Sequence, residues 1–283
     1  SSVPELQILT TGLVFGESPR WHNGRLWFSD MGANEVAAVD LEGTREVVAR
    51  VPAMPMGTGW LPDGCLLIVS ALDGRLVRRK PDGSLVTHAD LTTLGEHPWS
   101  DMVVDGRGNA YIGNIGFDFP GSEFAPGIVA LVTPDGSAQQ VANDVAFPNG
   151  MVVTPDNSTL IVAESYANRL TAFDIAIGGS LSNRRVWADL DDGVPDGICL
   201  DAESAVWYGD VPNKRCVRVR EGGEVLQVID LDRGCFACML GGVDRRTLFL
   251  MAAEFSAASM AGDGPRTGQV LTVEAPAPGV GWP

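Results

Sequence analysis

The sequence predicts an all-β protein, a six-bladed β-propeller, and three observations lead to that prediction. Short apolar stretches bounded by Gly, Pro, Asn and Asp turns, which are typical of strands, fill the 283-residue chain. No window has the pattern of a convincing amphipathic helix. One strand–turn–strand pattern recurs six times at about 40 to 50 residues, and four short strands per unit at that period are typical of a propeller blade.

The six units follow one another with the same order of strands. The first contains "GESPRW", a turn at "HNG" and then "RLWFSD", and the second runs from "GTGWLPDGCLLIVS" into "RLVRRKPDGSLV". The others open on "SDMVVDGRGNAYIGN", "NGMVVTPDNSTLIVAES", "DGICLDAESAVWYGD" and "CMLGGVDRRTLFLMAAE". Their first strands start near Glu17, Gly57, Ser100, Asn149, Asp196 and Cys238.

A continuous ring of such units leaves no place for a linker, so we expect one domain over residues 1–283. Its blades would begin near residues 12, 53, 95, 148, 195 and 235. A pair of β-sandwiches is the rival fold, but it would not need the same opening pattern six times. Because a closed ring has no free sheet edge to pair, we expect a monomer.

The overall charge limits the partners. The formal net charge is −16 and the pI is about 4.5, which disfavours nucleic acid and anionic membrane surfaces. Solubility alone explains most of this acidity, although it also suits a protein that holds a cation. No stretch approaches the roughly 18 to 20 apolar residues that span a bilayer, and "SSVPELQILTTG" lacks the regions of a secretory signal.

The cysteines indicate a reducing compartment. The chain has five, an odd number, which favours free thiols in the cytoplasm over a disulfide framework. The pair in "CFAC" stands alone, without a second pair or a nearby histidine, so it is weak support for zinc or redox chemistry.

Polar residues at the start of the first strands predict a metal site. In a propeller, first strands line the central channel, so Glu17, Ser100, Asn149 and Asp196 should converge on the axis. Two carboxylates and an amide without a basic partner require a proton or a cation. Oxygen ligands favour Ca²⁺ first, then Mg²⁺ or Mn²⁺, with Zn²⁺ and Fe²⁺ as alternatives. Each residue alone is equally consistent with a turn, because Pro-Asn-Gly and Pro-Asp-Gly are common turn tripeptides.

"GESPRW", "FPNGM" and "PDGICLD", in this order and at this spacing, resemble the senescence-marker-protein, gluconolactonase and luciferin-regenerating-enzyme family. "FACMLGG" resembles the last blade of that family, and the similarity runs from about Gly12 to Val273. The resemblance implies a six-bladed propeller with one divalent cation, ligated by Glu17, Asn149 and Asp196. It also implies hydrolysis of a lactone or a related ester.

Two positions depart from the family pattern. Family members usually have Asn-Asp at the inner strand of the third blade, where this chain has Ser100 and Asp101. Serine is shorter than asparagine, so a water could fill the gap to the metal. The neighbourhood "EHPWSD" also lacks the arginine with which sugar-lactone members hold sugar hydroxyls, which argues against an aldonolactone substrate.

The predicted chemistry is lactone opening assisted by the cation. A divalent ion polarises the carbonyl and lowers the pKa of a bound water. Asp196 is the first candidate for the base that takes the proton, and Asp101 is the second. Triad chemistry is a poor alternative, since no G-x-S-x-G occurs and the only histidines are His22, His88 and His97.

The substrate pocket should be more apolar than a sugar requires. The loop from Asn114 to Gly127 carries three phenylalanines, Phe119 among them, and suggests a cover over the site. The residues that we expect to bind substrate are Ser100, Trp99, Asn114, Phe119, Cys238 and Trp60. Packing between blades is the alternative role for the aromatic ones.

Two other classes of function compete with a lactonase. One is different chemistry at the same metal, such as phosphotriester or cyclic-imine opening, or dehydration. The other is a non-catalytic propeller that binds a ligand or partner protein, against which the channel carboxylates argue. Turnover that a chelator abolishes would separate the enzymes from the binding protein.

Overall fold

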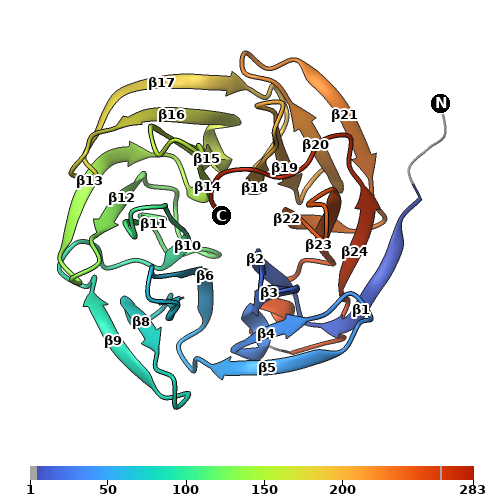
Figure 1. Cartoon of the computed structure of the whole chain (residues 1–283), viewed down its shortest axis with the longest axis horizontal. Helices are drawn as coiled ribbons and strands as arrows, with labels where there is room; N and C mark the ends of the chain where they lie inside the picture. Colours follow the sequence, from blue (N-terminus) through green and yellow to red (C-terminus); the bar gives the residue numbers. More distant parts are fainter. Residues whose placement is uncertain (1–4, 262) are drawn as a thin grey trace.

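Six four-stranded antiparallel sheets form a ring around a central channel, which confirms the predicted six-bladed β-propeller (Figure 1). The structure is a computed structural model, and it describes residues 5–261 and 263–283. We propose that the ring is a single domain. The expected span of 1–283 includes residues 1–4 and 262, which lie outside the described part.

The blades use the strands in chain order, from the channel outward. Blade one contains β2 (Gly16–His22), β3 (Arg25–Asp30), β4 (Glu35–Val39) and β5 (Arg45–Arg50). Blade two contains β6 (Pro55–Trp60), β7 (Leu66–Ser70), β8 (Arg75–Arg79) and β9 (Leu85–Asp90). Blade three contains β10 (Trp99–Val104), β11 (Ala110–Asn114), β12 (Gly127–Val132) and β13 (Ala138–Val145).

The second half of the chain repeats the arrangement. Blade four contains β14 (Pro148–Val153), β15 (Thr159–Glu164), β16 (Arg169–Ile175) and β17 (Leu181–Asp189). Blade five contains β18 (Pro195–Leu200), β19 (Val206–Asp210), β20 (Arg215–Val219) and β21 (Val225–Asp230). Blade six contains β22 (Gly234–Gly241), β23 (Thr247–Ala253), β24 (Gly268–Glu274) and, as its outermost strand, β1 (Gln7–Leu13).

The N-terminal strand therefore closes the ring. Strand β1 pairs antiparallel with β24, so the first and last strands of the chain share one sheet (Figure 1). The sequence pattern does not predict this strand, because the six repeats begin only after it. Hydrogen bonds between these distant strands hold the ring closed at the junction.

Inner strands are buried and outer strands are partly exposed. Every residue of β10 and β14 is buried, whereas β5 and β13 carry mostly exposed or half-buried side chains. The inner strands pack so closely that a Cβ on Gly150 would lie 2.6 Å from the carbonyl oxygen of Asp196. Glycine is needed there because any larger residue would push β14 away from β18.

The only helical elements in the described residues are short. They are the 3₁₀ turns η1 (Met31–Ala33) and η2 (Ser165–Ala167) and the helix α1 (Ala257–Met260). None of the described helices has the length and apolarity to cross a membrane.

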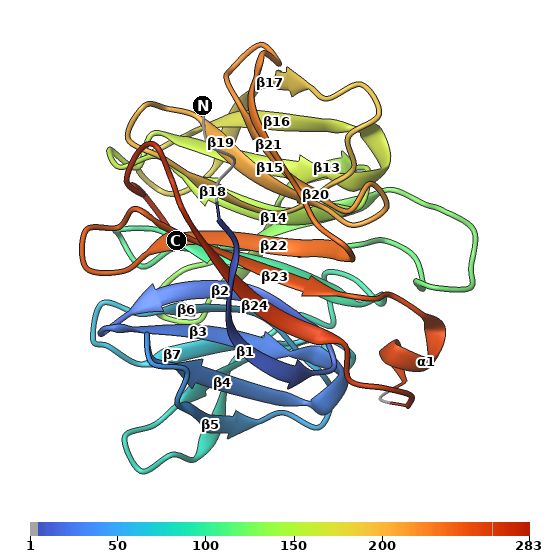
Figure 2. The ribbon, with the colours of Figure 1, turned by 90° about the vertical axis from the view of Figure 1, so that its right-hand side faces the viewer.

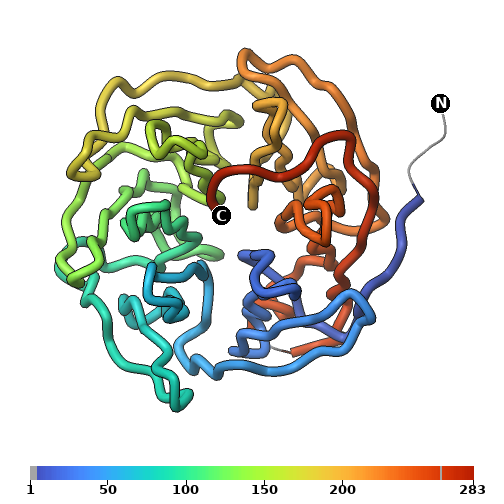
Figure 3. The backbone as a smooth tube through the Cα atoms, viewed as in Figure 1, coloured from blue at the N-terminus to red at the C-terminus, as the bar shows by residue number. Residues whose placement is uncertain are grey.

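The two mouths of the channel differ. Figure 2 shows α1, which lies in the connection from β23 to β24, on one face of the ring, and the C-terminal residues on the other. The tail crosses the second mouth, where Gly279 pairs with Asp201 and Trp282 with Val153. Figure 3 traces this tail from the rim to the middle of the ring. The mouth on the α1 side is therefore the entrance to the channel.

Candidate functional site

A cavity of about 240 Å³ lies at the α1 side of the channel. Its polar lining consists of Glu17, Ser100, Asn149 and Asp196, which come from the inner strands of blades one, three, four and five. The rest of the lining is apolar: Phe15, Met31, Met54, Met56, Leu72, Pro98, Trp99, Ile115, Phe119, Phe147, Phe236, Phe255 and Met260. Side chains from four separate blades thus converge, as the repeat pattern predicts.

A local irregularity in each inner strand carries the polar residues. The pairing register shifts between Glu17 and Arg20 in β2, and between Pro148 and Met151 in β14. Strands β10 and β18 have the same shift around Ser100 and Asp196. Such bulges are frequent next to active sites, because they re-aim a side chain that the regular pleat would direct elsewhere. Periodicity alone does not reveal them.

Three oxygens in this cavity have no hydrogen-bond partner. They are Glu17 Oε2, Asn149 Oδ1 and Asp196 Oδ1, all buried. Asp196 as a whole is half-buried, since it faces the cavity, but this oxygen is enclosed. Leaving a buried acceptor unsatisfied costs about 1–3 kcal/mol each, and more for charged groups. Three such oxygens in one site form a ligand set that fits a cation.

The ligand set is two carboxylates and one amide, which is oxygen only. Within residues 5–261 and 263–283, no group of three or more His, Cys, Asp and Glu side chains is placed to hold a metal. Hard cations such as Ca²⁺ accept carboxylate and amide oxygens together with water. The three residues therefore fit a divalent cation of the hard class better than zinc, which prefers nitrogen and sulfur ligands.

Ser165 orients the amide of Asn149. The Asn149 Nδ2 donates to Ser165 Oγ at 3.3 Å, and Ser165 Oγ donates to the Pro195 carbonyl oxygen at 2.6 Å. With its nitrogen engaged, Asn149 leaves its oxygen without a protein partner. Ser165 follows β15 and links blade four to blade five, so its role depends on packing that the sequence does not reveal.

Replacing Ser165 by alanine should weaken divalent-cation binding by about tenfold to a hundredfold, because the Asn149 amide loses its anchor. Calorimetric titration with Ca²⁺ measures the effect. Ser70→Ala is the matched control, since the Ser70 hydroxyl is equally buried but has no partner. Equal affinities in the two variants would show that Ser165 does not orient the ligand.

The two acidic residues hold a proton more tightly than ordinary carboxyls. Burial raises the pKa of Glu17 well above its usual value, and the nearby Asp196 carboxyl raises it further. Burial likewise raises the pKa of Asp196 to about 7, while the hydrogen bond with Glu17 partly opposes that rise. Without a cation, this pair therefore retains a proton at neutral pH.

Ser100, Trp99 and Phe119 all line the cavity, and their role in substrate binding stays a prediction. The hydroxyl of Ser100 is already engaged, since it donates to the carbonyl oxygens of Pro148 at 2.8 Å and Gly113 at 3.2 Å. It ties β10 to β14 beside Asn149.

Asp101, Asn114 and Cys238 lie outside the cavity lining. Asp101 forms a buried ion pair with Arg20, Oδ1 to Nη2 at 2.9 Å. Asn114 binds backbone, since its Nδ2 donates to the His97 carbonyl oxygen at 2.6 Å. Their proposed roles as base and as substrate ligand stay predictions.

Cys238 and Trp60 contact residues outside this cavity. The Cys238 thiol is buried, 3.8 Å from the thiol of Cys199, and burial raises its pKa well above the ordinary value. Trp60 stacks on His22, with ring centroids 3.8 Å apart, and lines a separate cavity of about 210 Å³ near Trp282. That cavity lies beside the opposite ends of the inner strands.

The apolar wall includes residues that the sequence analysis did not identify. Phe255 and Met260 come from the β23–β24 connection, which carries α1. Met54 and Phe147 precede inner strands with φ of 74° and 60°, a region that bulky residues rarely adopt. Such conformations gather at functional sites, where the surrounding structure holds them.

The predicted cover contributes an aromatic cluster. Phe117 lies in edge contact with Phe119, Phe124 and Phe147, at centroid distances of 6.3, 5.5 and 5.6 Å. Tyr166 packs 5.1 Å from Phe147. The loop between Asn114 and Gly127 is therefore fixed to blade four beside the entrance.

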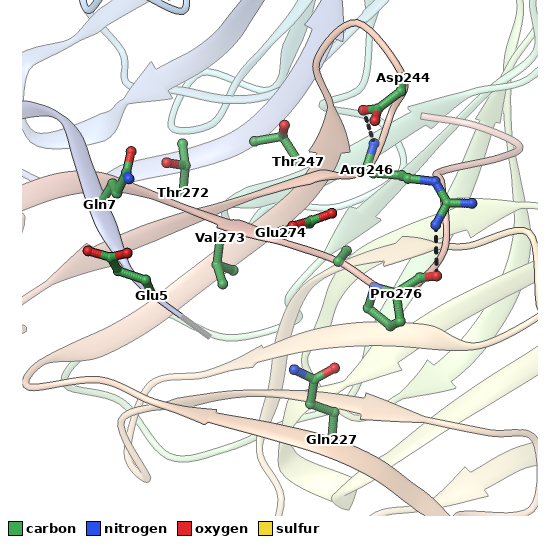
Figure 4. Close-up of a pocket in the computed structure, with 11 residues that line it drawn as sticks. Glu5, Gln7, Gln227, Asp244, Arg246, Thr247, Thr272, Val273, Glu274 and Pro276 are labelled. Carbon is green, nitrogen blue, oxygen red and sulfur yellow. Dashed lines mark hydrogen bonds between the residues drawn. The ribbon is translucent and has the colours of Figure 1, made fainter. Parts of the chain in front are cut away.

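A larger hollow of about 880 Å³ lies on the outer rim of blade six, between β1 and β21 (Figure 4). Two hydrogen bonds join residues of its lining: Asp244 accepts from the Arg246 backbone, and the Arg246 guanidinium donates to the Pro276 carbonyl oxygen at 2.9 Å. None of the buried unpartnered atoms of the described residues lies there. Size alone therefore does not identify the site.

Known proteins are similar to this chain in sequence and in fold. Regucalcin from Xenopus laevis is 27% identical over 269 residues, which cover 89% of this chain and 88% of that protein. The 6-deoxy-6-sulfogluconolactonase of Pseudomonas putida is 25% identical over 279 residues, or 95% of this chain and 94% of that protein. The crystal structure of a calcium-binding regucalcin from Agrobacterium tumefaciens has a TM-score of 0.80 at 21% identity, covering 97% of this chain and 96% of the other.

The family description "SMP-30/Gluconolactonase/LRE-like region" matches residues 15–254, from just before β2 to just after β23. That span includes all the inner strands and all three candidate ligands. The chain therefore belongs to the SMP-30/gluconolactonase/LRE-like family.

Proposed function

We propose that this protein is a divalent-metal-dependent hydrolase that opens a lactone with an apolar substituent. The observation that carries the proposal is the set of three unpartnered oxygens within an otherwise apolar cavity. Membership of the family supports the reaction class, since the Pseudomonas relative is named as a lactonase. The calcium-binding regucalcin supports Ca²⁺ as the first candidate ion.

Glu17, Asn149 and Asp196 would hold the ion, each through the oxygen that lacks a partner. When bound, a divalent cation supplies Lewis acidity toward a carbonyl oxygen and makes water a better nucleophile at neutral pH. Asp196 is our candidate for the general base, because its carboxyl faces the cavity beside the place of the ion. Asp101 is the second candidate, and its ion pair with Arg20 makes it the weaker one.

The apolar wall orients the substrate. No lysine or arginine lines the cavity among the described residues, and the Ser100 hydroxyl already binds two backbone carbonyls. A sugar lactone would bury hydroxyls without partners, at a cost of about 1–3 kcal/mol each. An alkyl or aryl substituent would instead contact Phe119, Phe236 and Met260, with the ring carbonyl beside the three oxygens.

A panel of substrates tests this function. We expect hydrolysis of γ- and δ-lactones with alkyl or aryl substituents, slower hydrolysis of δ-gluconolactone, and loss of activity with a chelator. Simple esters and phosphotriesters belong in the panel, because the same cation could act on them. Turnover that survives exhaustive chelation would show that the reaction does not depend on a metal. A complete lack of turnover with an ion bound would favour a ligand-binding propeller.

Replacing Phe119 by alanine should raise KM about tenfold for lactones that carry an apolar substituent, while unsubstituted γ-butyrolactone should be little affected. The reason is that the lost ring contacts only the substituent. Phe124→Ala is the matched control, because Phe124 belongs to the same loop but does not line the cavity. A similar change in both variants would mean that the loop acts by folding and not by contact.

A further inference from the structure

We propose that Arg20 sets the net charge of the metal site by neutralising Asp101, and so matches the site to a divalent ion. This inference rests on the proposed metal site. It makes Arg20 a positioning residue that acts through Asp101 and does not touch substrate. It also gives Asp101 a role other than that of a base.

Arg20 is held by three inner strands at once. Its Nη2 lies 2.9 Å from Asp101 Oδ1 and donates to the Met102 carbonyl oxygen at 2.7 Å. Its Nε donates to the Thr58 carbonyl oxygen at 3.1 Å, and its Nη1 to that of Pro19 at 2.9 Å. Both Arg20 and Asp101 have side chains only 3% exposed. The guanidinium therefore has one fixed position inside the channel.

Arg20 breaks the pattern of the ring. It pairs with Trp27, three residues before the end of β3. The corresponding positions in the other five inner strands are uncharged: Gly59, Val103, Val152, Cys199 and Cys238. A buried arginine is costly unless it is paired, so its presence at one of six equivalent positions needs a local reason.

We infer that Arg20 is present because of a third carboxylate near the metal site, that of Asp101. Asp101 is the neighbour of the lining residue Ser100 and lies just outside the lining, and its charge acts on both Glu17 and Asp196, whose pKa values it helps to raise. Glu17, Asp196 and Asp101 together carry −3 when ionised, and Arg20 brings the sum to −2. A divalent ion neutralises that sum. Without Arg20 the same channel would hold one uncompensated buried charge.

Arg20 also forms part of the lining of the cavity of about 210 Å³ near Trp282. The ion pair therefore lies between the metal site and the second mouth of the channel. This place explains why a fixed guanidinium, with donors to several carbonyls, occupies a position that an uncharged residue fills in the other blades.

A charge cycle tests the inference. Ca²⁺ affinity of chelator-stripped protein is measured by calorimetry for the wild type, Asp101→Asn, Arg20→Met and the double variant. In Asp101→Asn the net charge of the site is −1, and we expect Ca²⁺ to bind about tenfold more weakly. In Arg20→Met the net charge is −3, and we expect Ca²⁺ to bind about tenfold more tightly. The double variant, again at −2, should return to within about threefold of the wild type.

The opposite directions of the two expected changes in Ca²⁺ affinity separate an effect of charge from an effect of structure. If Arg20 only packs the channel, Arg20→Met and the double variant would both lose affinity, and that result would overturn the proposal. Asp201→Asn is the matched control, because Asp201 forms a buried ion pair with Arg218, at 2.8 Å, in the wall of blade five. It should leave Ca²⁺ affinity unchanged.

Two further results decide the remaining cases. If Arg20→Met does not fold, Asp101→Asn alone still tests the charge, since asparagine keeps the shape, and an unchanged affinity would overturn the proposal. A wild type that binds no Ca²⁺ would overturn both this inference and the metal site. Because no substrate is present, a failure of lactone turnover would leave the charge cycle standing and reject only the substrate.

Discussion

Replacing Asp196 by asparagine should lower kcat/KM for lactone hydrolysis by about 10³-fold or more. The change removes a charged ligand and the candidate base together, and the loss of one electrostatic group alone often costs 10²–10³-fold. Asparagine keeps the shape of the side chain, so β18 should retain its packing. Steady-state kinetics at saturating Ca²⁺ measure the effect.

Asp105→Asn is the control for that variant. Asp105 is also buried and has an unpartnered oxygen, but it lies at the far end of β10 and does not line the metal cavity. Its other oxygen accepts from the backbone of Arg107 and Asn109, which asparagine can still do. Activity of Asp196→Asn within about tenfold of this control would rule out Asp196 as both ligand and base.

Metal-free protein should lose stability as the pH rises from about 4 to above 7. The pKa of Asp196 is raised from 3.8 to about 7, and that of Glu17 is raised as well. A carboxyl with a higher pKa in the folded state stabilises the fold while protonated, and this contribution is lost as the pH passes the folded pKa. For Asp196 the loss is roughly 4 kcal/mol of unfolding free energy.

The Asp196→Asn variant should therefore be more stable than the wild type at pH 8 without metal, and close to it at pH 4. Saturating Ca²⁺ should reverse the order, since only the wild type gains stability by binding. Thermal unfolding at several pH values, with chelator and with Ca²⁺, measures both effects. A variant that is less stable than the wild type in chelator at pH 8 would show that the carboxylates do not repel each other.

The sequence predicts the fold class because the repeat is strong. Asn149 and Gly150 illustrate the limit of local rules, since Asn-Gly is usually a hairpin turn. Here both residues lie inside β14, and the turn comes later, where Asn157 has a φ of 59°. Comparison with the other repeats, and not the dipeptide itself, assigns the strand.

Features that depend on distant packing could not be predicted. Strand β1 lies outside the repeats, and only its pairing with β24 makes it part of a blade. In the candidate site, too, some residues could be predicted from the sequence and others could not. Glu17, Asn149 and Asp196 follow from the repeat, whereas Ser165 acts through hydrogen bonds between blades.

Asp101 shows that the sequence alone does not reveal the partner of a residue next to the site. Its neighbour Ser100 lines the cavity, and alternation along a strand does not say where Asp101 points after a bulge. The ion pair with Arg20 joins residues 81 positions apart. No local pattern connects them, and only the closed ring brings β2 and β10 to the same channel.

The most direct test of the account is the metal content of protein purified without added metal, measured beside that of Asp196→Ala. We predict about one divalent ion per chain in the wild type, most readily Ca²⁺, and none in the variant. That result would place the ion at the three oxygens and allow the substrate panel to be run with it. An absence of any ion from the wild type, even after incubation with Ca²⁺, Mg²⁺ and Mn²⁺, would contradict the metal site and the hydrolase built on it.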